Sequence, residues 1–263
     1  MSDHPGDSGT PGAGDPPRTM IATPSPAGRG ALAFAAVAGG VIGSLLTVTL
    51  VLVGGPKLGS GRMVHDALVA HPEMLVEASE ALKSRQYAPT ITANRAALET
   101  PYFSAWKGAA RPDVTLVYFF DYACGYCRMS NPAIDRLLAE DKGVRVVFRE
   151  LPILGANSVA AARISLIAAR TGKFAAYHDA LFAGGQPTPE AIGAALQSVG
   201  LPQPPANFDT REVDGEIRKN MAIAQALGAT GTPLFVIGDQ AINAAMGYDA
   251  LKQAVATARK TAS

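Results

Sequence analysis

Cysteine, histidine and net charge are all scarce in this sequence of 263 residues. Its two cysteines, Cys124 and Cys127, lie too close together to staple a fold, so stability must come from an apolar core. Four scattered histidines argue against a zinc site at this pair, because zinc takes about four ligands. A net charge of +1 gives no indication of a nucleic-acid partner. We therefore expect neither a metal nor a nucleic acid.

Charged residues are absent from positions 31–55, a run of 25 residues. An apolar run of this length spans a bilayer core as a helix. It exceeds the hydrophobic region of a cleaved signal peptide, and no small-residue cleavage site follows it. We predict a retained single-pass transmembrane anchor. The preceding residues, 1–30, contain six Pro and six Gly and are predicted to be a disordered tail.

Residues 56–100 are predicted to form a short helical, membrane-proximal segment. Apolar residues recur at helical spacing within 63–86, and Pro72 suits the first turn of a second helix. This apolar stripe needs a partner surface, either on the main domain or on other copies of the chain. We favour a homo-oligomer through residues 63–86, because this segment is a unit separate from the main domain that follows it in the chain. Packing within one chain is the open alternative.

The remaining residues, 101–263, have the pattern of an α/β domain. Residues 114–120, "VTLVYFF", and 144–151 are predicted strands, with a helix from about 124 to 140 between them. Strand, helix and strand at this spacing form a βαβ unit. A helical domain is inserted at about 155–228. A last strand and a last helix then close the domain.

The helix at 124–140 is predicted to carry Met129, Leu137 and Leu138 on its inner side and to be kinked at Pro132. Its start is the C-x-x-C sequence. There, unpaired backbone N–H groups and the helix dipole favour a thiolate, which makes Cys124 the attacking thiol. The second cysteine, one turn inside the helix, resolves the mixed disulfide that the first one forms.

Several sequence features in this order resemble the DsbA-like branch of the thioredoxin superfamily. They are "FFDYACGYC", Pro132, the helical insert and "GATGTPLFVIG". The segment before them, with "HPEMLVEASEAL" and "ITANRAAL", resembles the N-terminal region of Com1- and ScsC-like envelope thiol oxidoreductases, some of which oligomerise through it. The resemblance implies a thioredoxin-like fold. It also implies a redox-active disulfide between the two cysteines as the only cofactor.

The resemblance further implies that Pro233 is cis, with Thr232 before it, and that this loop holds a substrate peptide against Cys124. Gly125 and Tyr126, between the cysteines, are similar to the dipeptide of periplasmic disulfide isomerases. They favour a moderate oxidant or an isomerase over a strong oxidant. The direction of electron flow stays open.

The sequence departs from the family at Tyr118. Family members commonly carry a buried carboxylate six residues before the first cysteine, and a Tyr is a poor proton acceptor near neutral pH. Asp121 and Glu150 are the nearby acids that could accept a proton from Cys127. The alternative is that both are ordinary exposed acids. His178 is expected to pack inside the helical insert.

These observations predict a membrane-anchored envelope thiol–disulfide oxidoreductase with its catalytic domain on the periplasmic, or extracytoplasmic, side, because disulfide donors work where thiols are not kept reduced. Its partners would be unfolded or misoxidised exported proteins and a membrane thiol reductant or oxidant. Two alternatives stay open. One is a copper-handling envelope protein that uses the same thiols, and the other is a non-catalytic tethered adaptor.

Overall fold

The computed structural model describes residues 44, 60–203 and 210–262. The predicted tail at 1–30 lies outside these residues, and so does the predicted anchor at 31–55 apart from Ser44. Within the described part of the chain, no helix combines the length and apolar character needed to cross a membrane.

The chain divides into two units, and the first, Met1–Pro72, contributes one described helix, α2 (Ser60–Ala70). Apolar side chains on this helix, those of Met63, Val64 and Val69, are exposed. Within this unit, the described residues therefore do not bury the apolar stripe that the sequence predicted.

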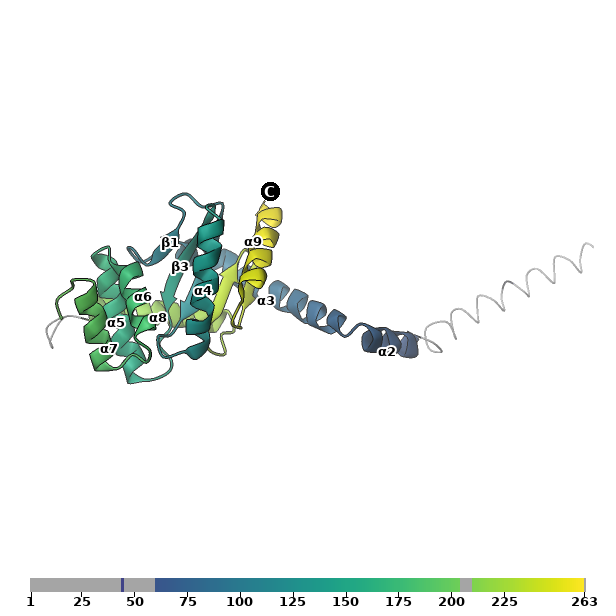
Figure 1. The fold of residues 1–263 in the computed structure, drawn as a ribbon. Helices are drawn as coiled ribbons and strands as arrows, with labels where there is room; N and C mark the ends of the chain where they lie inside the picture. Colours follow the sequence, from purple (N-terminus) through teal and green to yellow (C-terminus); the bar gives the residue numbers. More distant parts are fainter. Residues whose placement is uncertain (1–43, 45–59, 204–209, 263) are drawn as a thin grey trace, which may run out of the picture. The chain divides into compact units, whose positions relative to one another are not determined.

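The second unit, Glu73–Ser263, is built on a five-stranded mixed sheet (Figure 1). Its strands lie in the order β1-β3-β2-β4-β5. Their bounds are β1 (Trp106–Gly108), β2 (Val114–Phe120), β3 (Val144–Glu150), β4 (Leu234–Ile237) and β5 (Gln240–Ile242). Only β2 and β3 pair in parallel, and the other neighbours are antiparallel.

The central strands β2 and β3 are buried along almost their whole length. They pair in register from Val114 opposite Val144 to Phe120 opposite Glu150. A parallel pair covered on both faces needs such a nearly continuous apolar run, which is the signal that predicted both strands. The edge strands β1 and β5 have three residues each and were not predicted.

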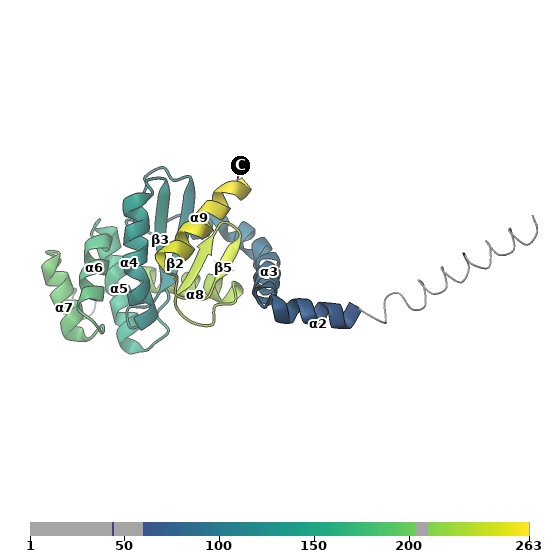
Figure 2. The ribbon, with the colours of Figure 1, turned by 45° about the vertical axis from the view of Figure 1, so that its right-hand side comes forward.

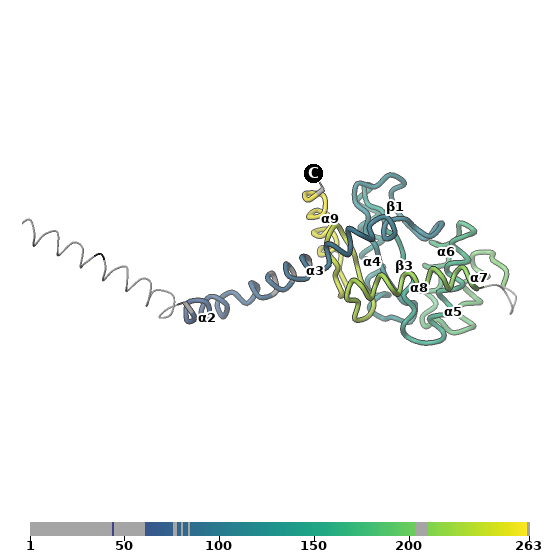
Figure 3. Tube along the Cα trace, turned by 180° about the vertical axis from the view of Figure 1, so that it is seen from behind, coloured from purple at the N-terminus to yellow at the C-terminus, as the bar shows by residue number. Residues whose placement is uncertain are grey.

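Helices cover both faces of the sheet (Figures 1 and 3). On one face, α4 and α9 pack against alternate strand side chains such as Leu116, Tyr118 and Phe148. On the other face, α3 and α8 cover Val117 and Phe119. The bounds of these helices are α3 (Glu73–Glu99), α4 (Gly125–Glu140), α8 (Arg211–Ala226) and α9 (Tyr248–Ala262).

Three further helices make up most of the predicted insert. They are α5 (Ala156–Arg170), α6 (Phe174–Ala183) and α7 (Pro189–Ser198). At the start of the helix α7, the Thr188 hydroxyl accepts from the Ala191 N–H. His178 on α6 is fully buried among aromatic rings, including those of Phe120 and Phe148, which confirms its packing role.

The helix α3 differs in burial along its length. Its N-terminal part exposes Met74, Leu75 and Leu82, whereas Ile91 and Leu98 near its C-terminal end are buried in the core. This end lies beside β5 (Figure 2). Packing within one chain therefore accounts for the end of the segment 56–100, and the exposed apolar residues are confined to its earlier part.

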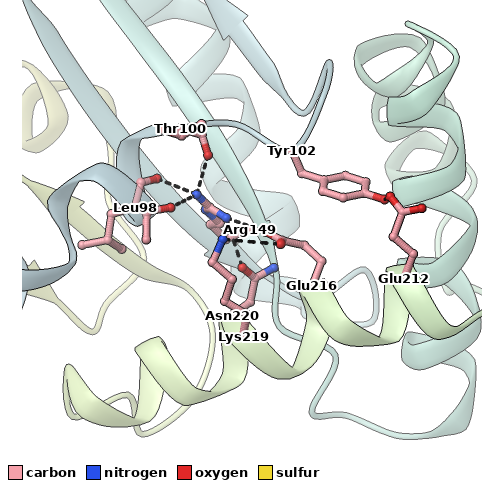
Figure 4. Close-up of polar contacts among 9 residues, drawn as sticks. Leu98, Thr100, Tyr102, Arg149, Glu212, Glu216, Lys219 and Asn220 are labelled. Carbon is pink, nitrogen blue, oxygen red and sulfur yellow. Dashed lines mark hydrogen bonds and ion pairs between the residues drawn. The ribbon is translucent and has the colours of Figure 1, made fainter.

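A buried arginine on β3 fixes the end of α3 (Figure 4). The guanidinium of Arg149 donates to the carbonyls of Ala97, Leu98 and Thr100. It also donates to the Glu216 carboxylate and the Asn220 side-chain oxygen of α8, at 2.6 and 3.3 Å. The carbonyls at a helix end lack partners within the helix, so this one side chain satisfies them and joins α3, β3 and α8.

The inner face of α4 differs from the prediction at one position. Its buried residues are Cys127, Ser130, Ile134 and Leu137, at spacings of three and four. Met129 falls outside this stripe and is 71% exposed, so its predicted inward position was wrong.

Candidate active site

The two cysteines lie at the start of α4, directly after β2. Cys124 is the N-cap of the helix, with φ −79° and ψ 116°, and its sulfur accepts a hydrogen bond of 3.3 Å from the Cys127 N–H. Cys127 is completely buried, and both cysteines are free thiols. The extended backbone at Cys124 aims its sulfur at the unpaired N–H groups of the first turn.

The two thiols have opposite acidities. A hydrogen bond with the Cys127 side chain is the main reason that the pKa of Cys124 falls to about 5, and the backbone N–H groups of Cys127 and Tyr126 add to it. Burial raises the pKa of Cys127 far above its ordinary value, and the neighbouring Cys124 raises it further. At neutral pH the pair therefore holds one thiolate and one thiol.

The loop before β4 approaches the first cysteine from the opposite side. The Thr232–Pro233 peptide bond is cis, as the resemblance implied. The Thr232 carbonyl oxygen lies 3.2 Å from the Cys124 sulfur and accepts a hydrogen bond from it when Cys124 is protonated. The Thr232 side chain also helps to lower the pKa of Cys124.

A pocket of about 270 Å³ opens between this loop, Tyr126 and the β5–α9 loop. Its lining residues are Tyr126, Thr230, Gly231, Thr232, Pro233, Asn243, Ala244 and Ala245. The Asn243 side chain accepts from the Thr230 N–H and donates to the Gly228 carbonyl, both at 3.3 Å. It thus ties the β5–α9 loop to the cis-proline loop.

The cis-proline loop begins at Gly228, directly after α8. Its φ of +69° is a conformation that glycine adopts readily, and a side chain there would meet the Tyr87 hydroxyl of α3. The close approach places the tip of Tyr87 against the first residue of this loop.

Asp121 is buried and fully engaged. One carboxylate oxygen accepts from the Ala123 N–H at 2.8 Å, and the other accepts from the N–H groups of Ile153 and Leu154 at 2.8 and 2.9 Å. It is therefore not the exposed loop acid of the alternative interpretation. Its oxygens bind backbone donors, and they hold the β3–α5 loop against the active-site turn.

Glu150, at the end of β3, is also buried. The alternative interpretation, that it is an ordinary exposed acid, was therefore wrong as well. Unlike Asp121, it has no hydrogen-bond partner for either carboxylate oxygen among the described residues. Burial raises its pKa well above the ordinary value, more than the nearby Ser165 hydroxyl lowers it. Glu150 faces the same side of the sheet as Phe148 and Tyr118, which line the core beneath α4.

Apolar side chains surround the cysteine pair on the surface. Tyr126 and Met129 are 65% and 71% exposed, and the loop that Asp121 holds exposes Ile153 and Leu154. Sequence reasoning missed this loop and Asn243. "PILG" after a strand and a single Asn after a three-residue strand carry no period that would mark them as part of a site.

A CxxC pair at a helix start, beside a cis-proline loop on a mixed sheet, defines a thioredoxin-like protein. The chain belongs to the family of DSBA-like thioredoxin domains, which its residues 115–256 match. Residues 61–88 match the N-terminal domain of the copper resistance protein ScsC. The resemblance drawn from the sequence is confirmed, and the chain is a member of the DsbA/ScsC-like family of thiol–disulfide oxidoreductases.

Solved structures agree with this assignment. A periplasmic thioredoxin-like protein from Salmonella enterica serovar Typhimurium is 34% identical, with a TM-score of 0.58, and the match covers 63% of this chain and 95% of that one. The catalytic domain of Proteus mirabilis ScsC is 25% identical, with a TM-score of 0.60 and coverage of 66% and 99%.

A curated relative is much longer than the matched region. The Na(+)/H(+) antiporter NhaA 3 of Salinispora tropica is 29% identical over 157 residues, which are 58% of this chain and 24% of the antiporter. The chain thus spans about a quarter of the length of the curated relatives it matches.

Proposed function

We propose that this protein is a membrane-anchored envelope thiol–disulfide oxidoreductase that forms or rearranges disulfides in exported proteins. The carrying observation is the opposite acidity of its two cysteines. Cys124, with a pKa of about 5, attacks as a thiolate, and the buried Cys127 stays protonated until it resolves the mixed disulfide. The redox-active disulfide between them is the only cofactor of the proposed reaction.

The substrate is an unfolded or misoxidised polypeptide. The pocket beside Thr232 and Pro233, and the exposed Tyr126, Ile153 and Leu154, support this proposal because they offer apolar surface on two sides of Cys124. An extended chain laid along the cis-proline loop would bring its own sulfur into line with the Cys124 sulfur. Folded proteins rarely present such a segment, so the site prefers substrates that have not completed folding.

The direction of exchange is proposed to be that of an isomerase or a moderate oxidant. Gly125 and Tyr126 support this choice, because no histidine between the cysteines adds to the stabilisation of the thiolate. An isomerase must be kept reduced by a membrane thiol reductant, whereas an oxidase needs a membrane oxidant. A homo-oligomer through residues 63–86 fits an isomerase, and the exposed apolar residues of α2 and the first part of α3 support it.

The membrane anchor at 31–55 and the extracytoplasmic position of the catalytic domain belong to the same proposal. The anchor is tested by alkaline carbonate extraction of membranes from cells that express the full chain. The full chain stays in the membrane fraction, and a chain without 31–55 leaves it. Release of the full chain would refute the anchor without touching the redox function.

The refolding of two forms of one multi-disulfide protein tests the activity. The proposed isomerase restores the scrambled form, an oxidase acts only on the fully reduced form, and Cys124→Ala abolishes both activities. Activity on the reduced form alone would overturn the isomerase direction. Wild-type protein that restores neither form would leave copper handling or the tethered adaptor as the function.

A second candidate function is copper handling. The match of residues 61–88 to a domain named for copper resistance favours it, and two thiols suit Cu(I). Within 60–203 and 210–262, no group of three His, Cys, Asp or Glu side chains comes together as a metal site. Equilibrium dialysis with Cu(I) tests this candidate. Retention by wild type and loss in Cys124→Ala would support it, and equal retention by both would exclude the cysteine pair.

A further inference from the structure

Asp121 opens the turn that carries the attacking cysteine. Its backbone carbonyl accepts from the Cys124 N–H at 3.0 Å, and its carboxylate accepts from the Ala123 N–H at 2.8 Å. Both contacts are typical of an aspartate at the first position of a turn, where the short side chain reaches the backbone two residues on. The position of Cys124 at the start of α4 therefore depends on this residue.

The same carboxylate reaches the loop that follows β3. The Leu151 N–H continues the pairing with β2, through a backbone hydrogen bond of 2.8 Å, but Pro152 has no N–H to extend it. The next two N–H groups, those of Ile153 and Leu154, both donate to the second carboxylate oxygen of Asp121, at 2.8 and 2.9 Å. The backbone of this loop is thus fixed against the turn.

The strand order places this loop beside Cys124, on the side away from the cis-proline loop. β2 lies between β3 and β4. The parallel strands β2 and β3 end at the same edge of the sheet, and the antiparallel strand β4 begins there. The turn of Cys124, which continues β2, is therefore flanked by the β3–α5 loop on one side and by Thr232 and Pro233 on the other.

Two apolar side chains of the held loop face solvent. Ile153 is 44% exposed and Leu154 is 53% exposed, whereas the carboxylate that binds their N–H groups is buried. Gly155, with a φ of +129°, ends the loop in a conformation that favours glycine. Single exposed apolar residues are common, but these two are neighbours on a backbone that a buried group holds in place. Surface that is fixed in advance lowers the entropy cost of binding.

We propose that Asp121 is a positioning residue for substrate recognition. It holds Ile153 and Leu154 as an apolar wall beside Cys124, and this wall takes an apolar side chain next to the reacting cysteine of the polypeptide substrate. The inference rests on the proposed function and names the substrate class, which is cysteines with apolar neighbours in the sequence. Apolar neighbours are mostly buried in a folded protein, so the wall selects chains that have not completed folding.

The covalent step brings this side chain to the wall. The Cys124 thiolate attacks one sulfur of a substrate disulfide, the bond from Cys124 to that sulfur forms, and the disulfide bond of the substrate breaks. The electron pair of the broken bond leaves on the other sulfur, which is reduced as Cys124 is oxidised. The substrate cysteine is then bonded to Cys124, and an extended chain advances only about 3.3 Å per residue. Its sequence neighbours therefore lie within reach of the two flanking loops.

Two peptide disulfides test the wall. Each peptide carries one cysteine, with leucine on both sides in one and serine on both sides in the other, linked to a nitrothiobenzoate that is coloured when it leaves. Stopped-flow reaction with the reduced full chain gives a second-order rate constant for each peptide. Wild type should react roughly three- to tenfold faster with the leucine peptide, as partial burial of a leucine side chain provides. The double variant Ile153→Ser/Leu154→Ser should lose most of this preference.

Asp121→Ala separates the presence of the wall from its position, because it keeps both apolar side chains and removes the group that holds them. Both rate constants should fall, since the same carboxylate supports the turn of Cys124. The leucine preference should fall as far as in the double variant, which a general loss of structure would not produce. Met221→Ser is the matched control. It removes an exposed apolar side chain of α8, and both rate constants should match those of wild type.

Equal rate constants for the two peptides in wild type, or a double variant that keeps the preference, would overturn the wall. An Asp121→Ala protein that keeps the preference would overturn the positioning role. A change of molecular mass by light scattering in the double variant would assign these side chains to contact between copies of the chain, and would also overturn the proposal. Wild type that releases no coloured thiol from either peptide would instead refute the redox function itself.

Discussion

Two neighbouring residues of β3, Arg149 and Glu150, are buried to the same extent and treated in opposite ways by the fold. Arg149 faces α3 and α8, where carbonyls, a carboxylate and an amide surround it. Glu150 faces the side of the cysteine pair and has no hydrogen-bond partner among the described residues. A buried charge that has partners joins the helices and strands that supply them. A buried acid without partners stays neutral, and the free energy of unfolding then depends on pH.

The largest effect is expected at the arginine. Arg149→Met should lower the free energy of unfolding by about 3–5 kcal/mol, because it leaves Glu216 and three carbonyls without their donor. Urea unfolding measures this loss. Arg136→Gln breaks an exposed pair with Glu140 and should match wild type within error. Equal losses in both variants would show that burial and partners do not distinguish these arginines.

The next effect concerns the acid and has the opposite sign. Glu150 is raised in pKa on folding, so its contribution is fully present below about 4.5, its ordinary pKa, and declines as the pH rises toward the folded value. Glu150→Gln removes this decline. The variant should gain about 1.4 kcal/mol over wild type for each pH unit above about 4.5, until the folded pKa is reached. Parallel stability curves for the two proteins against pH would contradict the burial of a neutral acid.

The smallest effect is expected at Asp121, a buried acid that does have partners. Asp121→Ala leaves the N–H groups of Ile153 and Leu154 without their acceptor and should cost about 2 kcal/mol. Hydrogen exchange of these two amides should speed up, while exchange within β2 stays as in wild type. Unchanged protection at Ile153 and Leu154 would show that the carboxylate does not hold this loop.

Local pattern was enough to predict the central strands and the helix behind the cysteines, whereas the cis-proline loop was implied by the family resemblance. Continuous apolar runs mark β2 and β3, and the CxxC pair marks the start of α4. The edge strands β1 and β5 are too short to show any period. The predicted inward position of Met129 was wrong. The next residue, Ser130, belongs to the buried stripe of α4, and a step of one residue along a helix turns the side chain by about 100°.

The burial of Asp121 and Glu150 could not be predicted in the same way. In the sequence, both acids stand next to apolar strand residues. Whether each acid finds hydrogen-bond partners depends on groups that come from distant positions in the chain. Two of the three N–H groups that bind Asp121 are 32 and 33 residues away. That no described residue hydrogen-bonds to the Glu150 carboxylate is a property of the packed core.

The contact between Tyr87 and Gly228 couples two positions that are far apart in the sequence. A methyl group at 228 would strike the phenol and would also sit on a backbone with positive φ. The glycine can therefore be exchanged only together with the tyrosine, and even then at a cost in backbone strain. The residues at positions 87 and 228 should therefore vary together among relatives. A chimera that joins α3 of one relative to the catalytic domain of another needs both residues from the same parent.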